Sequence, residues 1–330
     1  MTAPTIPKAF IWRRVHSLMG LWLVLFLLEH LLTNSQAALL LGENGAGFVR
    51  MVNAIHDLPY LSALELFLIG TPIAIHAFWG IRYLFTAKSN SFKSDGSKPS
   101  LPQYKRNKAY TWQRITSWIL VFGIIAHVAK FRFIEYPESV REGLDTYYFV
   151  KVSNDPGLYT LEPRLGFQIY DAEKISQQVK ESEINNHAQA SYENRYDFWQ
   201  SSAPYNHDEE AYTQKMQENL FKQQWINALV KKKIIGNEII AVSKSFGTAT
   251  LLSVRDAFKS PVYVVLYTIF VLAACFHAFN GLWTFMISWG LILRRAAQKT
   301  MGTICVSIML LIAFLGLAAI WGTYWINLKY

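Results

Sequence analysis

The sequence predicts an all-α membrane protein with five transmembrane helices and an inserted extracytoplasmic α+β domain. Three observations predict this fold class: long apolar stretches, an uneven distribution of charge, and one polar segment of different composition. The chain has 330 residues, of which 52% are hydrophobic and 17% are charged. We expect transmembrane helices 1–3 within residues 1–134, the inserted domain in 135–259 and helices 4–5 in 260–330.

Five stretches of the chain are nearly free of charge and long enough to cross a membrane. A helix rises about 1.5 Å per residue, so about 20 residues cover the ~30 Å of hydrocarbon in a bilayer. The first stretch is followed by no small-residue cleavage site, which argues against a cleavable signal peptide. The predicted spans are residues 15–34, 59–81, 115–134, 261–291 and 302–326.

The net charge of +9 is concentrated beside these spans. Residues 135–259 hold 18 acidic and 14 basic side chains, whereas the rest of the chain holds 5 acidic and 18 basic ones. This distribution indicates a membrane partner and argues against nucleic acid. By the positive-inside rule, the N-terminus and the loop of residues 82–114 are cytoplasmic, and residues 135–259 and the C-terminus lie outside a bacterial inner membrane.

The segment 135–259 is large enough for a small domain with its own core. The two cysteines, Cys275 and Cys305, fall in predicted spans, so this segment has no disulfide framework and no cysteine-ligated metal site. We expect a structural cap or an interaction surface. Its strands are predicted at residues 145–153 and 164–172, its helices at 174–200 and 209–233, and a hairpin at 237–258 with Gly247 near the turn.

Four histidines lie well inside predicted spans, one on each of the first four. Two of them begin nearly identical stretches, "HAFWG" at residues 76–80 and "HAFNG" at 277–281. An ionisable side chain within the bilayer is costly and usually marks a functional site. A single such histidine could equally be a neutral group bonded to the backbone of a neighbouring helix, but four on four spans favour a shared function. These histidines are His30, His76, His127 and His277.

Depth divides the four histidines into two pairs. His30 and His127 lie well beyond the last arginine before their apolar stretches, on spans that leave the cytoplasm. At a rise of about 1.5 Å per residue, they lie ~24 Å and ~20 Å from the cytoplasmic side, near the outer face. His76 and His277 lie on spans that enter from outside, each ~24 Å from the outer face, which places both near the cytoplasmic face.

Two histidines that face each other across a helix bundle suit one haem iron with two imidazole ligands. The sequence thus predicts a four-helix haem-binding bundle with two haem b groups, stacked as an electron path across the membrane. A zinc site would need more ligands at one depth, and a proton relay would carry more carboxylates than Glu29 and Glu65. A haem-free scaffold in which the histidines only pack is the remaining alternative.

Glycines accompany the histidines at helical spacing. A porphyrin edge needs a helix face without side chains, which glycine supplies, although close packing of two helices makes the same demand. Gly80 and Gly281 each follow a histidine by four residues, Gly123 precedes one by four, and Gly20 precedes one by ten.

Four stretches carry a family resemblance: "RRVHSLMGLWLVLFLLEHLLTN", "ALELFLIGTPIAIHAFWG", "QRITSWILVFGIIAH" and "FHAFNGLWTFMISWG". They resemble the haem-bearing spans of the five-helix, dihaem cytochrome b subunit of succinate:menaquinone oxidoreductases and related fumarate reductases. The resemblance covers about residues 1–134 and 259–330, and the connection of about 125 residues between spans three and four departs from it. It implies His30 and His127 on the outer haem, His76 and His277 on the inner haem, and that His16 and His56 are not ligands.

The resemblance also implies a role as the non-flavin membrane anchor of succinate dehydrogenase, in the respiratory chain and the tricarboxylic acid cycle. A flavoprotein and an iron–sulfur subunit would dock on the cytoplasmic side and deliver electrons through both haems to menaquinone. Arg82 and Arg114 are candidates for docking or for the inner haem propionates, and ordinary positive-inside anchoring explains them equally well. The same anchor in a fumarate reductase, or in another dehydrogenase, is the alternative.

Quinone reduction takes up protons, so we expect a carboxylate near the outer haem. Glu65 lies five residues after Tyr60, hence ~8 Å below the outer surface on the second span. It is the predicted catalytic residue, with Glu29 as the competing candidate. A structural role, in which the carboxylate reaches the interface or bonds the backbone, is the alternative for Glu65.

Overall fold

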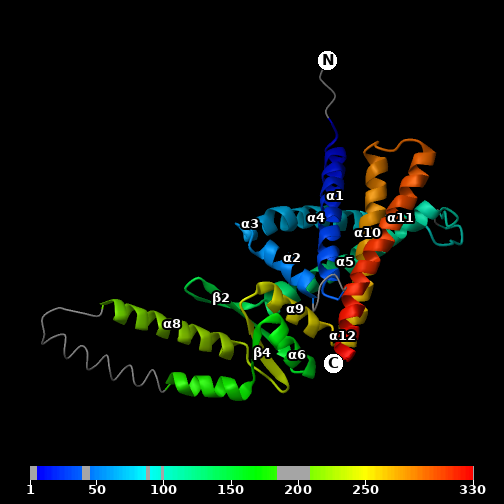
Figure 1. Cartoon of the computed structure of the whole chain (residues 1–330). Coiled ribbons are helices and arrows are strands. Elements are labelled where there is room, and N and C mark those ends of the chain that lie inside the picture. Colours follow the sequence, from blue (N-terminus) through cyan, green and yellow to red (C-terminus); the bar gives the residue numbers. More distant parts are fainter. Residues whose placement is uncertain (1–5, 39–44, 87–89, 98–99, 184–208, 330) are drawn as a thin grey trace, which may run out of the picture. The chain divides into compact units, whose positions relative to one another are not determined.

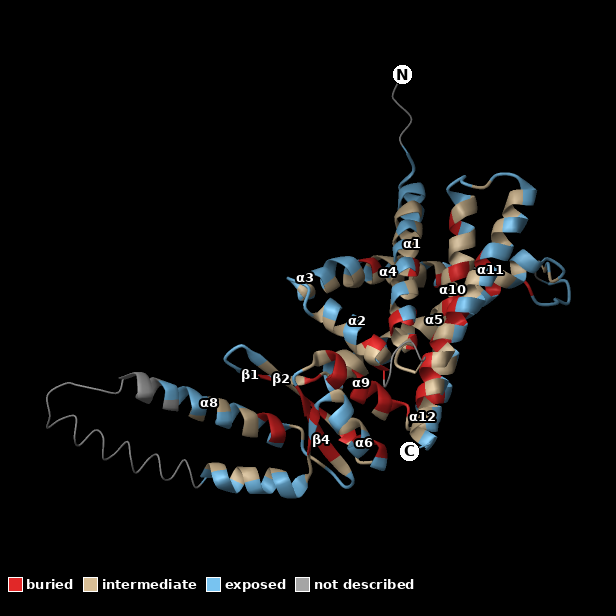
Figure 2. Cartoon of the chain, viewed as in Figure 1, coloured by how far each residue is buried: buried red, intermediate tan, exposed pale blue. Residues whose placement is uncertain are grey.

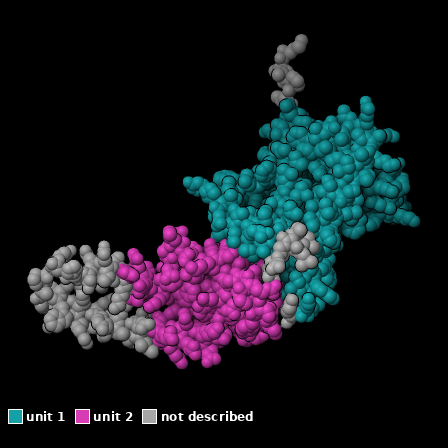
Figure 3. Space-filling view, viewed as in Figure 1, with its two compact units in different colours: residues 1–133, 258–329 teal, residues 134–257, 330 magenta. Residues whose placement is uncertain are grey.

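The structure is a computed structural model, drawn as a cartoon in Figure 1. The chain forms two compact units, which are coloured separately in Figure 3. The structure describes residues 6–38, 45–86, 90–97, 100–183 and 209–329. Unit 1 comprises Met1–Phe133 and Phe258–Lys329, and unit 2 comprises Ile134–Ala257.

Unit 1 contains the five predicted spans. Among the described residues, five helical segments are long and apolar enough to cross a membrane, by length and composition: Lys8–Ser35, Leu61–Thr86, Lys105–Ile134, Pro261–Ser288 and Arg295–Lys329. In the most apolar part of each segment, no more than 33% of the residues are buried within the protein. The outward side chains are mainly large and apolar, as contact with lipid requires. The prediction of five apolar spans is confirmed.

Three spans are assembled from several helical elements. The first and fourth spans are single helices, α1 (Lys8–Ser35) and α10 (Pro261–Ser288). The second is α3 (Leu61–Glu65), η2 (Leu66–Gly70) and α4 (Thr71–Thr86). The third is α5 (Lys105–Val128) and η3 (Ala129–Ile134), and the fifth is α11 (Arg295–Leu317), η4 (Ala318–Gly322) and α12 (Thr323–Lys329). The η elements are π-helical turns, which often occur at functional sites.

A short helix, α2 (Ala46–His56), precedes the second span. The sequence analysis did not identify it, because its 11 residues lie outside the long apolar stretches. Phe48 is buried on this helix, whereas Met51 and Ile55 are exposed. The helix ends at His56, and the second span begins shortly afterwards at Leu61. His56 is thus close in sequence to Glu65, and both belong to the polar cluster described below.

Unit 2 is built on a four-stranded antiparallel sheet in the order β1-β2-β4-β3. Its strands are β1 (Glu138–Glu142), β2 (Asp145–Ser153), β3 (Phe167–Tyr170) and β4 (Glu238–Ser243). Its helices are α6 (Pro156–Leu165), residues 172–183, α8 (Glu209–Lys231) and α9 (Phe246–Ala257).

The central strand β4 is buried on both faces of this sheet (Figure 2). Ile239 and Ala241 pack with side chains of α6 and α9, while Ile240 and Val242 pack with side chains of α8. Successive side chains of a strand point to opposite faces, so a continuous apolar run on β4 provides one core on each side. Unit 2 therefore has helices on both faces of its sheet.

The strand predicted at residues 145–153 is confirmed by β2, and the helix predicted at 209–233 by α8. Of the strand predicted at 164–172, only Phe167–Tyr170 forms β3, and residues 164–165 end α6 instead. Of the helix predicted at 174–200, the part up to residue 183 is helical and the rest lies outside the described residues. β1 and α6 were not predicted.

The predicted hairpin at 237–258 is wrong, because β4 is followed by the helix α9. The Ser245 hydroxyl accepts a hydrogen bond from the Thr248 backbone N–H at 3.1 Å, as a helix N-cap does. Gly247 is buried in the first turn of this helix and forms no hairpin turn. The buried Ala249 and Leu252 follow at helical spacing and pack against the sheet.

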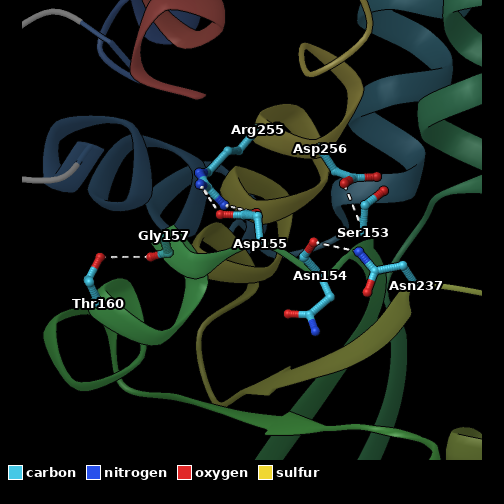
Figure 4. A network of polar contacts seen from close by, with 8 residues as sticks. All are labelled: Ser153, Asn154, Asp155, Gly157, Thr160, Asn237, Arg255 and Asp256. Carbon is cyan, nitrogen blue, oxygen red and sulfur yellow. Dashed lines mark hydrogen bonds and ion pairs between the residues drawn. The ribbon is translucent and has the colours of Figure 1, made fainter. Parts of the chain in front are cut away.

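A buried ion pair joins α9 to the loop before α6 (Figure 4). Both terminal nitrogens of Arg255 donate to the Asp155 carboxylate, at 2.9 and 2.7 Å. The adjacent Asp256 accepts a hydrogen bond from the Ser153 backbone N–H at 2.8 Å. Only 7% of the Arg255 side chain is exposed, so loss of its charge would remove the cation that faces the largely buried Asp155 carboxylate.

We expect Arg255→Met to lower the unfolding free energy of unit 2 by about 3 kcal/mol, because removing one member of a buried ion pair strands the other. Protease susceptibility of the purified full-length chain across a urea series measures this loss. The control is Lys244→Met, which removes an ion pair with Asp145 whose side chains are 59% and 53% exposed. That change should leave the transition close to that of the unaltered chain, because exposed ion pairs contribute little to stability, and equal losses in the two variants would contradict a structural role for Arg255.

Candidate functional site

The structure brings the four intramembrane histidines together in two pairs. His30 on α1 and His127 on α5 have ring centres 5.9 Å apart, with an interplanar angle of 85°. His76 on α4 and His277 on α10 have ring centres 6.1 Å apart, with an angle of 81°. Each pair therefore joins two different spans, and the partners are those that share a depth in the sequence analysis.

These distances fit a metal ion held between two imidazoles. With metal–nitrogen bonds of about 2 Å, two imidazoles that bind one metal ion could have ring centres up to ~6 Å apart. Direct contact between the two nitrogens would bring the ring centres closer. The donor set, one imidazole from each of two helices, is the set that a haem b iron takes in a helix bundle.

Hydrogen bonding orients the ring of His76. Its Nδ1 lies 3.0 Å from the His16 carbonyl oxygen, and because a carbonyl only accepts, Nδ1 carries the proton. That tautomer leaves Nε2 with a lone pair for a metal. His16 makes the reciprocal bond, donating from Nδ1 to the His76 carbonyl oxygen at 3.1 Å, and the two rings stack with centres 4.1 Å apart.

His277 has a similar arrangement made from different side chains. Its Nδ1 lies 3.4 Å from the Ser117 hydroxyl and 3.5 Å from the Thr116 hydroxyl, both on α5. Those hydroxyls donate to the carbonyls of Gln113 and Trp112, so their lone pairs face the ring. The geometry favours a proton on Nδ1 of His277 and a free Nε2.

The histidines of the other pair lie among aromatic side chains. His127 Nδ1 lies 3.2 Å from the Tyr267 hydroxyl on α10, and the Phe131 ring centre lies 5.4 Å from that of His127. Phe26 stacks on His30 at 5.3 Å. Apolar walls exclude water and limit how far the rings can turn, which favours a fixed ligand geometry.

The two "HAFxG" stretches use their glycines in the same way. Gln113 Nε2 donates to the His277 carbonyl at 3.0 Å and would lie 3.6 Å from a Cβ on Gly281. His16 donates to the His76 carbonyl and would lie 3.5 Å from a Cβ on Gly80. In an α-helix the carbonyl of residue i faces residue i+4, so a glycine there opens the carbonyl to a side chain from the next helix.

The other two predicted glycines are points of close approach between helices. A Cβ on Gly20 would lie 2.9 Å from His76 Cε1 and 3.2 Å from Nδ1, which is closer than carbon atoms pack. A Cβ on Gly123 would overlap the Phe270 ring of α10. The missing side chain at Gly20 therefore allows the His76 ring to occupy its position.

Glu65 belongs to a polar cluster at the end of the second span. Arg132, in the π-helical turn after His127, donates from Nη2 to Glu65 Oε2 at 2.7 Å. Both side chains are more than a third exposed. Burial lowers the pKa of the nearby His56, and the negative charge of Asp57 opposes that shift. Sequence reasoning missed Arg132, whose only signal was a cation inside an apolar stretch.

The remaining predicted residues have other partners. The competing carboxylate Glu29 accepts a hydrogen bond from the Thr33 hydroxyl of its own helix at 2.8 Å. Arg114 Nη2 donates to the Leu84 carbonyl at 3.1 Å, near the end of α4. Arg82 lies over the Trp79 ring, with its guanidinium carbon 4.8 Å from the ring centre.

Comparison with known proteins finds a relative for part of the chain. The chain is similar to the succinate dehydrogenase cytochrome b558 subunit of Bacillus subtilis (strain 168), with 33% identity over 126 residues. The match covers 38% of this chain and 56% of the relative, so the chain spans little more than half the length of that protein. No family model and no solved structure matches the chain. The similarity supports the family that the histidine-bearing spans resemble.

We expect Gly20→Ala to weaken haem binding about tenfold, because the new methyl group overlaps the His76 ring and overpacking costs about 1–3 kcal/mol. Haem per chain and the reduced-minus-oxidised spectrum measure the loss. Gly80→Ala is the matched control, since its Cβ would meet His16 at an ordinary 3.5 Å. Equal haem content in the two variants would contradict the role of Gly20 in positioning His76.

Proposed function

We propose that the chain is the haem b membrane subunit of a succinate dehydrogenase, which passes electrons from an iron–sulfur subunit through two haems to menaquinone. The observation that carries this proposal is the presence of two histidine pairs, each joining two spans, with ring centres 5.9 and 6.1 Å apart. The similarity to a succinate dehydrogenase cytochrome b558 subunit supports the choice of complex.

His76 and His277 are the proposed ligands of the inner haem, and His30 and His127 those of the outer haem. Bound haem would supply one-electron transfer at its iron. The chain supplies the rest: the contacts to Nδ1 of His76 and His277 favour a free Nε2 on those two rings, and aromatic side chains around His30 and His127 exclude water.

The proposed orientation follows from charge. The many basic residues between the second and third spans support a cytoplasmic location for that connection, with residues 135–259 on the outside of a bacterial inner membrane. The flavoprotein and iron–sulfur subunits would dock at the cytoplasmic end. Unit 2 would act as a structural cap or an interaction surface outside.

Menaquinone reduction needs protons as well as electrons, and we assign their delivery to Glu65. Its carboxylate lies on the second span at the depth of the outer histidine pair and is paired with Arg132. His56, whose pKa is lowered by burial, lies near that pair. A carboxylate beside an imidazole provides two groups that exchange protons in sequence.

Leucine substitutions at the four histidines test the ligand pairs. His76→Leu and His277→Leu should each lose the same spectral component, that of the inner haem, and His30→Leu and His127→Leu the other component. Haem per chain should fall by about half, because one of two sites loses an axial ligand. His56→Leu is the control and should keep both components. Loss of the same component from His76→Leu and His30→Leu would overturn the pairing.

Glu65→Gln should keep both haems and succinate-to-dye activity, and reduce menaquinone reduction at least tenfold, because the amide cannot exchange protons. Glu29→Gln is the matched control, since that carboxylate bonds within its own helix. Visible spectra together with quinone and dye assays on the purified complex measure the three properties. Unchanged quinone activity in Glu65→Gln would remove this residue from the site and move the assignment to Glu29.

A further inference from the structure

A pocket lies between the first turns of α1 and the last turns of α4. Its volume is about 410 Å³. It lies at the ends of two helices that are long and apolar enough to cross a membrane, one to two turns beyond His76 on α4. Its Tyr83 meets the ring of His16 at 5.4 Å. The side chains that give the pocket its chemistry are Lys8, Arg13, Arg82, Trp12, Trp79 and Tyr83.

The pocket is cationic. Three of its side chains carry a positive charge, and no acidic residue lines it. The sequence has no Asp or Glu in residues 1–28 or 66–94, so neither helix end carries a neighbouring counter-ion. The adjacent Arg14 is used elsewhere: it donates to the Ser288 carbonyl and lies over the Trp289 ring. Three positive charges around one pocket favour an anionic ligand.

Aromatic rings form one wall of the same pocket. Trp12 and Trp79 stack with ring centres 4.9 Å apart, and the guanidinium carbon of Arg82 lies 4.8 Å from the centre of the Trp79 ring. The stacked rings form a rigid surface and hold Arg82 in place. Tryptophan rings are enriched at the headgroup level of membranes, where one side meets lipid and the other meets water.

We propose that this pocket binds the headgroup of an anionic phospholipid, with the phosphate held by Lys8, Arg13 and Arg82. Basic pockets between transmembrane helices on the cytoplasmic side suit such headgroups. The acyl chains would then lie along the helices, where Leu18 and Phe78 are 44% and 59% exposed. The position at the ends of two spans favours a lipid over free phosphate, because only a lipid also covers those apolar side chains.

Native mass spectrometry of the purified full-length chain, with its accompanying subunits, measures the binding. Dioleoylphosphatidylglycerol should bind at least tenfold more tightly than dioleoylphosphatidylcholine, and sodium phosphate at equal ionic strength should not displace it. The double variant Arg13→Gln/Arg82→Gln should bind phosphatidylglycerol about thirtyfold more weakly, because two phosphate contacts are lost. The charge-conserving double variant Arg13→Lys/Arg82→Lys should retain most of the affinity.

The matched control is Arg294→Gln/Arg295→Gln, which removes the same charge from exposed residues outside the pocket. This control should bind phosphatidylglycerol as tightly as the unaltered chain does. An equal loss of binding in both double variants would mean that the lipid responds only to diffuse surface charge, and it would overturn the proposal. Equal binding of the two lipids, or displacement by phosphate alone, would also overturn it. Haem per chain is measured in the same double variants, and a loss of haem in Arg13→Gln/Arg82→Gln that parallels the loss of lipid would assign these arginines to haem propionates and overturn the proposal.

Discussion

The hydrogen bond between a helix-borne imidazole and a group on the next helix is the interaction on which the bundle depends. A histidine inside an apolar span must satisfy both ring nitrogens, and lipid offers neither a donor nor an acceptor. In the structure, a carbonyl of α1 satisfies Nδ1 of His76, and a hydroxyl of α10 lies beside Nδ1 of His127. These contacts tie particular helices together at particular heights, so they set helix pairing and ring orientation at once.

The spans and the histidine pairs could be predicted from sequence because both depend on distance along a helix. A charge-free stretch gives the length of a span, and the constant rise of a helix per residue gives the depth of each histidine. The partner of Glu65 could not be predicted in this way. Arg132 lies in a π-helical turn, where the backbone departs from regular helical spacing, so its direction does not follow from its residue number.

Unit 2 shows where short-range patterns fail. The run Ile239–Val242 alternates between two buried faces and is strongly β-branched, so a strand there follows from sequence. The next residues, 243–250, are mostly small or hydroxylated, a composition compatible with both strand and helix. The Ser245 cap and the packing of Ala249 against the sheet stabilise a helix at this position. Packing between segments that are distant in sequence cannot be inferred from a short stretch of residues.

In both "HAFxG" stretches, a glycine one turn after the histidine opens the histidine carbonyl to a donor from the next helix, although the donor residue differs. Each glycine exposes the carbonyl of the histidine one turn earlier, and a side chain from the neighbouring helix donates to that carbonyl: His16 for His76, and Gln113 for His277. Asn280 in turn donates to the Gln113 oxygen at 2.7 Å and fixes that amide. An alanine Cβ would still meet the donor at an ordinary distance, 3.5 Å at Gly80 and 3.6 Å at Gly281, whereas a side chain longer than that of alanine would crowd the donor. The repeated pentapeptide is therefore a helix-contact motif, which explains why the glycine recurs at the same spacing although the donor differs.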